Sequence, residues 1–284
     1  MAHEEQARKR YPTDLTDEQW VIVEPRLPPA RTQHGGTPRR VDMRAVLDTL
    51  LDQNRTGCQG EMLPHELLPK STVYDYCAQW RDEGTWAKIV RLLRTRVREQ
   101  EGREPTPSAA CLDSQSIKTT AVGGPERGYE GGKKSTGRKR HVLVDTIGLL
   151  LVVLITSAAL DDGAAAIKLL AQIRAEDFPR LTVIFGASKS HHHALEAWLT
   201  AHRPGWRIEV KKRPEGSTGF TPLPKRWVVE RTNAWHGRSR RHSKDYERKP
   251  ESSAAPIHLS NLQLMLPRLC PVPQHEFHYR KEAA

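Results

Sequence analysis

The first hundred residues place apolar side chains at helical intervals. Within residues 86–97, Trp86, Val90, Leu93 and Val97 recur at spacings of four, three and four residues, which is typical of an amphipathic helix. Similar spacings occur within residues 43–50 and 73–80. Short helices joined by turns predict an all-α, helix-turn-helix-like domain over residues 1–100 that binds DNA. A helical packing domain without DNA contacts fits the same pattern.

The beginning and the end of this helical pattern are marked by local signals. Thr16 and Gln19 have the spacing of a capping box, which predicts a helix that begins there and is disrupted at Pro25. The charged, proline-rich stretch 101–108 follows the last helical pattern. We therefore expect a domain boundary at residues 100 and 101, with a second domain over residues 101–284.

The second domain has the pattern of an α/β protein. Residues 109–113, 141–145, 149–155, 181–185 and 206–210 are short and rich in aliphatic side chains, as buried strands are. The turn residues 146–148 separate two of these runs and predict a hairpin. Helical patterns lie between the later strands and after them, the last two at 224–240 and 255–269. This order predicts a mixed sheet flanked by helices.

Charge narrows the choice of partner. The chain has 45 Lys and Arg against 34 Asp and Glu, a formal net charge of +11, which favours a polyanion such as nucleic acid. A basic enzyme unrelated to nucleic acid has the same charge. The longest apolar run, residues 147–155, is too short to span a bilayer, and the N-terminus has no apolar signal-peptide core. We expect a cytoplasmic protein that has no membrane partner.

The four cysteines and the three consecutive histidines do not predict a metal site. Cys58, Cys77, Cys111 and Cys270 include no C-x-x-C pair, so we expect reduced thiols. Residues 191–193 are all histidine, and on a helix they would point in three directions and could not converge on one ion. No P-loop and no G-x-S-x-G motif is present, which argues against nucleotide binding and against a serine hydrolase.

Two acidic residues are candidates for chemistry. Asp113 ends the short apolar run at 109–112, so its carboxylate would emerge where a metal can reach it, although a strand-ending turn is the commoner use of Asp. Glu230 lies in the arginine-rich stretch predicted as a helix, on one face with Arg226 and Arg238. It either pairs with arginines on a solvated helix or binds a metal while the arginines hold phosphates.

Basic side chains concentrate in two stretches. Residues 131–140 form a glycine-containing basic arm that leads into a predicted strand, and residues 226–244 surround Glu230 with cations. We expect phosphate contacts from eight of them: Lys133, Lys134, Arg138, Lys139, Arg226, Arg238, Arg241 and Lys244.

Several blocks of the sequence, taken in order, resemble a known family. The blocks are YPTDLTDEQW at 11–20, RTGCQ at 55–59, MLPHE at 62–66, STVYDY at 71–76, LDSQSIKTT at 112–120, GGKKSTGRKRHVLVDTIGLLL at 131–151, RWVVERTNAW at 226–235 and SKDYE at 243–247. Together they resemble DDE transposases of small bacterial insertion sequences, in the branch with a helical N-terminal domain. The resemblance extends from Tyr11 to about Leu269.

The resemblance implies an RNase H-like catalytic domain that cleaves and joins DNA strands. It implies that Asp113 and Glu230 are catalytic metal ligands for Mg²⁺ or Mn²⁺, the hard cations that carboxylates select. It also implies that the protein binds the ends of an insertion sequence and target DNA, and that it forms a homodimer on the DNA, in the bacterial cytoplasm near the nucleoid.

The sequence departs from the family at the second catalytic acid. Relatives usually have an Asp in an Ala-Asp-Ser-Lys-Tyr-like stretch, and here Ala187 stands at that position. Ser190 stands where an aromatic residue is usual, and Gly60 where the family often has Trp. The resemblance therefore implies an impaired transposase. A catalytically dead DNA-binding regulator derived from a transposase is the alternative, and a nuclease that cuts without joining is another.

Overall fold

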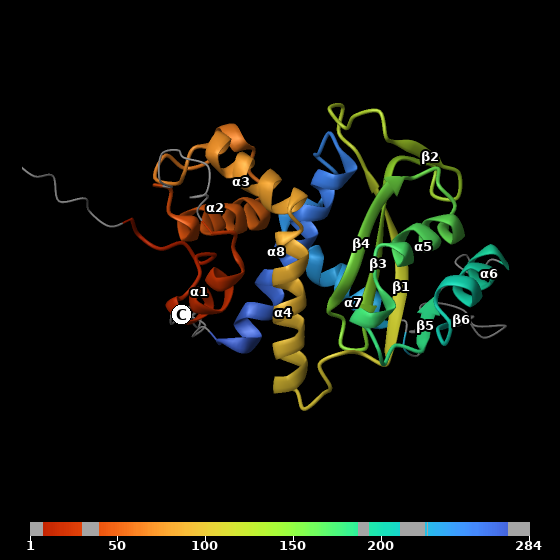
Figure 1. The fold of residues 1–284 in the computed structure, drawn as a ribbon. Helices are drawn as coiled ribbons and strands as arrows, with labels where there is room; N and C mark the ends of the chain where they lie inside the picture. Colours follow the sequence, from red (N-terminus) through yellow and green to blue (C-terminus); the bar gives the residue numbers. More distant parts are fainter. Residues whose placement is uncertain (1–7, 30–39, 187–192, 211–224, 226, 272–284) are drawn as a thin grey trace, which may run out of the picture.

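The computed structural model describes residues 8–29, 40–186, 193–210, 225 and 227–271. Helices form the N-terminal part of the chain, and a mixed sheet with helices on both faces forms the rest (Figure 1). None of the helices in these described ranges combines the length and apolarity that crossing a membrane requires.

Four helices make up the N-terminal region, as the apolar spacing predicts. They are α1 (Asp17–Val23), α2 (Met43–Thr56), α3 (Lys70–Asp82) and α4 (Thr85–Gln100). The capping box is confirmed: the Thr16 hydroxyl accepts from the Gln19 amide, and the Gln19 side chain accepts from the Thr16 amide. A short 3-10 turn at Glu24–Arg26, with Pro25 inside it, replaces the α-helix where the proline disrupts it.

The sheet is mixed, as the sequence predicts. Its strands are β1 (Ala109–Lys118), β2 (Gly128–Glu130), β3 (Ser135–Asp145), β4 (Leu150–Ser157), β5 (Val183–Gly186) and β6 (Arg207–Val210). The central strand β1 pairs antiparallel with β3, and β3 pairs antiparallel with β2 and β4. On the other side of β1, β5 and then β6 add in parallel. The predicted hairpin is confirmed as β3 and β4.

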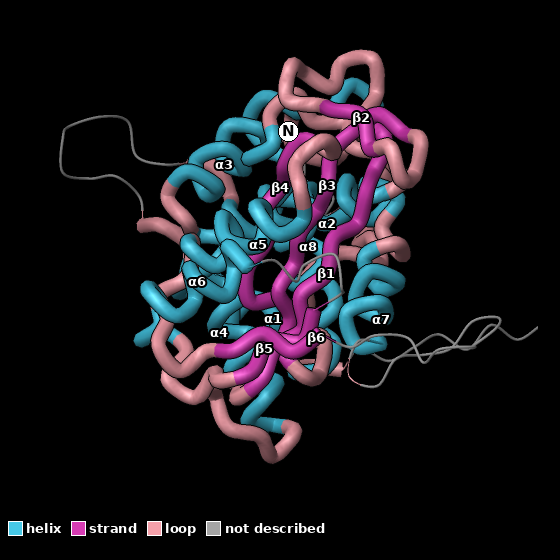
Figure 2. Tube along the Cα trace, turned by 90° about the vertical axis from the view of Figure 1, so that its right-hand side faces the viewer, coloured by secondary structure: helices cyan, strands magenta, loops and turns pink. Residues whose placement is uncertain are grey.

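Different helices cover the two faces of the sheet (Figure 2). One face packs against α5 (Asp162–Ala171) and α6 (His193–His202), through a core that includes Leu112, Leu143 and Leu169. The other face packs against α7 (Trp227–His236), α8 (Pro250–Leu269) and α4. Because side chains alternate along a strand, odd-numbered residues at the start of β1, such as Cys111, face the α7 side.

The hydrophobic core runs without a break from the N-terminal helices to the sheet. Its members include Leu47 of α2, Leu93 of α4, Val144 of β3 and Leu262 of α8. Helix α8 comes from the end of the chain, yet it packs against α2 and α4 (Figure 1). The division into domains 1–100 and 101–284 stays a prediction, and the two regions share one core.

Candidate functional site

Strand β1 presents Asp113 toward α7. Cys111 belongs to the core on the α7 side, and Leu112 belongs to the core on the opposite side. Asp113, two residues after Cys111, therefore points to the α7 side. The side-chain amide Nδ2 of Asn233, on α7, donates to the Asp113 carboxylate Oδ2 at 3.2 Å. The Asp113 side chain is half-buried, so it is held by the protein and still open to solvent.

Glu230 lies on the same part of α7 as Asn233, one helical turn earlier. Two contacts hold the chain to β1, one before Glu230 and one after it. The Cys111 thiol contacts the main-chain carbonyl of Lys225 at 3.1 Å, and Asp113 accepts from Asn233. Residues three apart on a helix share a face, so Glu230 is on the face of α7 that also presents Asn233. Glu230 is in the first turn of α7, where a negative charge is stabilised by the helix dipole.

Strand β5 leads to the third expected position of the site. Phe185 pairs in parallel with Cys111, and β5 ends at Gly186. Ala187, the next residue, lies outside the described residues, as does Arg226. The described end of β5 therefore borders the part of β1 that carries Asp113.

Other acids that could compensate for Ala187 have structural partners. Asp145 is fully buried, forms a salt bridge with Arg98 at 2.7 Å, and accepts from the Ile147 and Leu149 amides in the β3–β4 turn. Asp161 caps α5 through the amides of residues 163 and 164. Asp162 accepts from Ser114 at 3.1 Å, on the face of β1 opposite to Asp113. None of these three acids is arranged as a substitute ligand.

The donors present at the site fit a hard cation better than a soft one. Carboxylates of Asp113 and Glu230 and the amide oxygen of Asn233 are oxygen donors, which suit Mg²⁺ or Mn²⁺. Among the described residues, however, no group of three or more His, Cys, Asp or Glu side chains is placed to hold a metal ion.

Two of the eight predicted phosphate contacts must be corrected. Arg138 is fully buried, and its guanidinium donates to the main-chain carbonyls of four residues, 123, 126, 247 and 248, and lies 3.3 Å from Asp245. Lys139 is also buried, and its ammonium binds the Leu160 carbonyl and Asp162 at 2.9 and 3.1 Å. Both side chains hold loops to β3 and cannot reach DNA.

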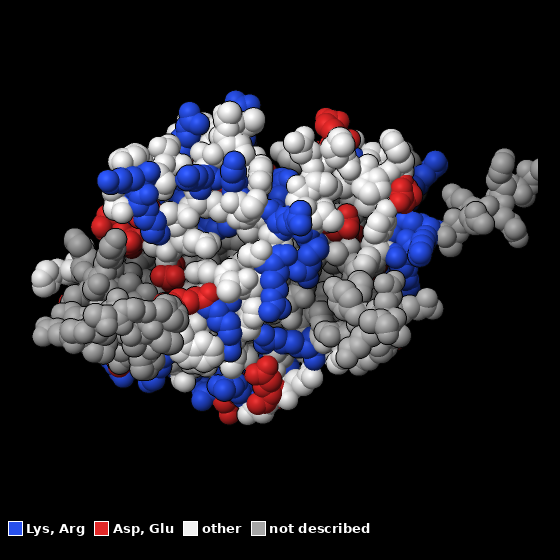
Figure 3. Space-filling model, turned by 180° about the vertical axis from the view of Figure 1, so that it is seen from behind, with Lys and Arg blue, Asp and Glu red and all other residues white. Residues whose placement is uncertain are grey.

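The remaining predicted phosphate-binding cations differ in solvent exposure and in their contacts with other side chains. Lys133, Lys134, Arg238 and Lys244 are exposed. Arg241 is half-buried, pairs with Glu247 and stacks on the Tyr246 ring at 5.7 Å. Seen from behind the view of Figure 1, Lys and Arg side chains form a band down the middle of the molecular surface (Figure 3).

The helix that carries Glu230 is shorter than predicted. It ends at His236, and the chain then turns through Gly237 into a 3-10 turn at Arg240–His242, labelled η5. His242 is buried and binds the Ser260 hydroxyl of α8 at 2.7 Å, so the chain turns inward. Arg238 therefore lies beyond the helix and does not share a helical face with Glu230.

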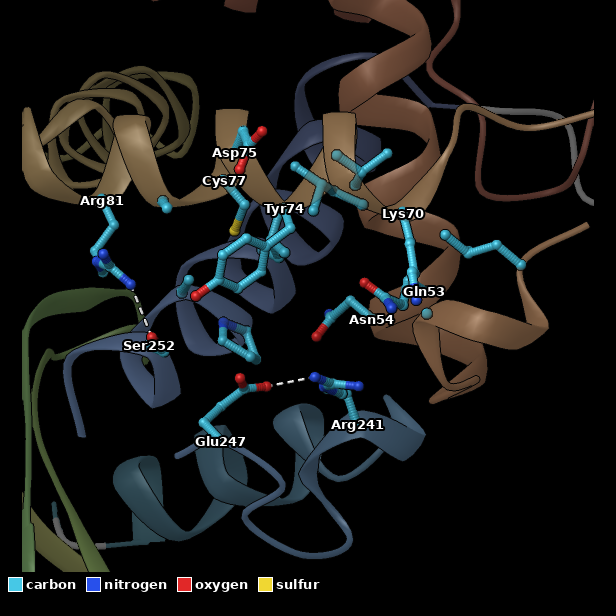
Figure 4. Close-up of a pocket in the computed structure, with 18 of the residues that line it drawn as sticks. Gln53, Asn54, Lys70, Tyr74, Asp75, Cys77, Arg81, Arg241, Glu247 and Ser252 are labelled. Atoms are coloured by element: carbon cyan, nitrogen blue, oxygen red, sulfur yellow. Dashed lines mark hydrogen bonds and ion pairs between the residues drawn. The ribbon is translucent and has the colours of Figure 1, made fainter. Parts of the chain in front are cut away.

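Sequence reasoning missed Asn233 as a partner of Asp113. The spacing of three residues from Glu230 was the available signal, because it places Asn233 on the same helical face. It also missed the cavity of about 500 Å³ between α2, α3 and α8. Figure 4 shows Arg241, Glu247 and Arg81 around this cavity, with Tyr74 extending into it from α3. Cys77 also lines it, and burial raises the pKa of this thiol to about 12.

Family models match most of the chain. Residues 104–266 match the transposase DDE domain, and residues 15–90 match a putative transposase of the IS4/5 family. The chain belongs to the DDE transposases of insertion sequences.

One curated relative is similar to part of the chain. It is the "Insertion element IS402 uncharacterized 16.2 kDa protein" of Burkholderia cepacia, 31% identical over 113 residues, which are 38% of this chain and 76% of that protein. A solved structure, "Mos1 transposase paired-end complex with left transposon end", aligns at 14% identity with a TM-score of 0.24. That alignment covers 62% of this chain and 60% of the other.

Proposed function

We propose that this transposase binds the ends of an insertion sequence and that Asp113 and Glu230 are its remaining catalytic metal ligands. One observation carries the proposal. Asn233 donates to Asp113 at 3.2 Å from the same face of α7 as Glu230, which supports a shared site for these two acids, 117 positions apart in the chain.

The chemistry would be metal-dependent cleavage and joining of DNA strands. When bound, Mg²⁺ or Mn²⁺ supplies charge stabilisation for phosphodiester cleavage. Asp113 and Glu230 would hold one such ion weakly, and Asn233 would keep the Asp113 carboxylate oriented toward it. Alanine at position 187 has no oxygen to coordinate an ion, so a second ion would lack its ligand.

We propose that strand transfer is impaired for this reason. Loss of one well-placed electrostatic group commonly lowers the rate on the order of 10²–10³, and loss of an ion lowers it further. DNA binding would persist, through Lys133, Lys134, Arg238, Lys244, Arg226 and Arg241. The protein would act as a homodimer on DNA, in the cytoplasm near the nucleoid.

The test restores the missing acid. Ala187→Asp is compared with the unmodified chain and with Ala187→Asn, which has nearly the same size without the charge. We expect Ala187→Asp alone to bind Mn²⁺ more tightly in calorimetry and to nick a DNA fragment that carries insertion-sequence ends. Adding Asp113→Asn should remove the gain. Robust strand transfer by the unmodified chain would show that another acid replaces the one at 187.

A DNA-binding regulator without catalysis is the second candidate, and Ala187 favours it. This function predicts binding to the element ends by all variants and no nicking by any of them, in Mg²⁺ or in Mn²⁺. Nicks without joined products would instead indicate a nuclease.

A further inference from the structure

The RTGCQ segment, residues 55–59, packs against the turn that follows α7. Gly57 ends α2 in the left-handed conformation, with φ of 71°. A Cβ added at Gly57 would lie 3.0 Å from the backbone carbon and from the Cβ of Arg240. Only glycine permits both this conformation and this close approach, so the end of α2 and the Arg240 backbone lie in direct contact.

This contact brings three exposed arginines together. The Arg55 guanidinium Nη1 lies 3.4 Å from the main-chain carbonyl of Arg238 and donates to it. Arg55, Arg238 and Arg240 are all exposed. One comes from the N-terminal helical region, and the other two come from the segment just after the helix that carries Glu230.

None of these three arginines forms a salt bridge with a carboxylate in the described ranges. Arginines elsewhere do so: Arg98 with Asp145, Arg138 with Asp245 and Arg241 with Glu247. Like charges held together repel one another unless an anion neutralises them. Guanidinium groups are suited to phosphate because their planar donors can bind two phosphate oxygens at once.

We infer that Arg55, Arg238 and Arg240 form one binding site for the phosphate backbone of DNA, bridging the two regions of the chain. The inference rests on the proposed DNA binding and extends it to a residue of α2. The site lies in the segment that follows α7, so a backbone bound there would be held by the N-terminal helices and by the Glu230 segment together.

The test measures how salt weakens binding to a random-sequence DNA duplex. Fluorescence anisotropy gives Kd at several salt concentrations for the unmodified chain and for the triple variant Arg55→Gln, Arg238→Gln, Arg240→Gln. Each lost phosphate contact should reduce the slope of log affinity against log salt by about 0.9. A matched control removes three exposed cations in and after α5, on the opposite side of the sheet, by Lys168→Gln, Arg174→Gln and Arg180→Gln.

We expect the slope of log affinity against log salt to be less steep in the triple variant than in the unmodified chain. It should equal that of the unmodified chain in the control and in Arg55→Lys, which keeps the charge. Arg55 lies in the last turn of α2, where a cation also stabilises the helix, so thermal unfolding is followed in parallel. Should the triple variant unfold, Arg240→Gln gives the same readout, because its side chain has no hydrogen bond within the described residues.

Two failures are distinguishable. A steep slope for the unmodified chain that is the same in the triple variant, or an equal fall in the control, overturns this site and leaves DNA binding intact. A flat slope for the unmodified chain overturns the proposed DNA binding itself, and this site with it.

Discussion

Two basic stretches of this transposase have similar sequences and opposite environments. Arg138, Lys139 and Arg140 on β3 are buried, and each donates to a main-chain carbonyl. Arg238 and Arg240, after α7, are exposed. The three cations on β3 use their positive charge to hold the fold together, and the two after α7 leave theirs at the surface. A run of cations therefore does not by itself locate a nucleic-acid interface.

The largest expected effect is on the free energy of unfolding, which should fall far more when an arginine of the buried stretch is replaced than when one of the exposed stretch is. Arg138→Gln removes a guanidinium that satisfies four carbonyls and faces Asp245. Breaking such a buried pair costs about 3–5 kcal/mol, because Asp245 keeps its charge without its partner. The exposed counterpart Arg238→Gln should change the free energy of unfolding by at most about 0.5 kcal/mol. Chemical denaturation of both variants measures the difference, and equal losses would contradict the comparison.

An intermediate effect on stability concerns the buried histidines in and near the exposed stretch after α7. Burial lowers the pKa of His236 to about 3, of His242 to about 2 and of His258 to about 4, and for the first two the positive charge of Arg140 is a second, smaller cause of that shift. These values lie below the unfolded value of about 6.5, so the neutral forms stabilise the fold above pH 6.5. This contribution is lost as pH falls, by about 2 kcal/mol for each histidine at pH 5.

His242→Gln tests this acid sensitivity. The variant should lose less stability than the unmodified chain between pH 7 and pH 5, by about 2 kcal/mol, in denaturant titrations at each pH. His141, whose pKa burial lowers to about 4, acts in the same direction. Asp48 opposes it, because burial raises its pKa to about 6 and its proton stabilises the fold in acid. An identical pH dependence in the variant would exclude His242 as a contributor.

The sequence predicted what local patterns determine. The helix predicted within residues 86–97, the capping box at Thr16 and the β3–β4 hairpin depend on neighbours in the chain, and the structure confirms them. The burial of Arg138 depends on loops near residues 123 and 247 that converge on β3. No local pattern contains that convergence, so the arginine was expected at the surface.

The candidate site shows the same division between local and distant information. Asp113 and Glu230 are candidates from their places in the sequence, the resemblance implies their catalytic roles, and those roles remain predictions. The contact of Asn233 with Asp113 depends on how α7 packs against β1, which spacing alone does not determine. Helix α7 ends at His236, and His242 then binds Ser260 of α8, another contact between distant segments.

The smallest expected effect on stability concerns the cavity that Arg241 lines. This arginine of the exposed stretch pairs with Glu247. Gly60 lines this cavity. The nearest neighbours of a Cβ added there would be the Lys70 Cβ at 3.4 Å, the Lys70 Cδ at 3.8 Å and the Gln53 amide nitrogen at 3.9 Å, which are ordinary contact distances. The cavity of about 500 Å³ has room for an indole against Leu63, Val73 and Leu259.

Gly60→Trp should therefore stabilise the fold by about 1 kcal/mol, the usual gain from filling a cavity, because apolar surface leaves water and α2 and α3 gain a shared contact. Gly131→Trp is the matched control, since nothing lies within 4 Å of its added Cβ and the ring would stay in solvent. Thermal unfolding should show a higher Tm for the first variant alone. If both variants behave alike, the cavity does not accept the ring. If Gly60→Trp also weakens DNA binding, filling the cavity has displaced Arg241, in agreement with its proposed contact with DNA.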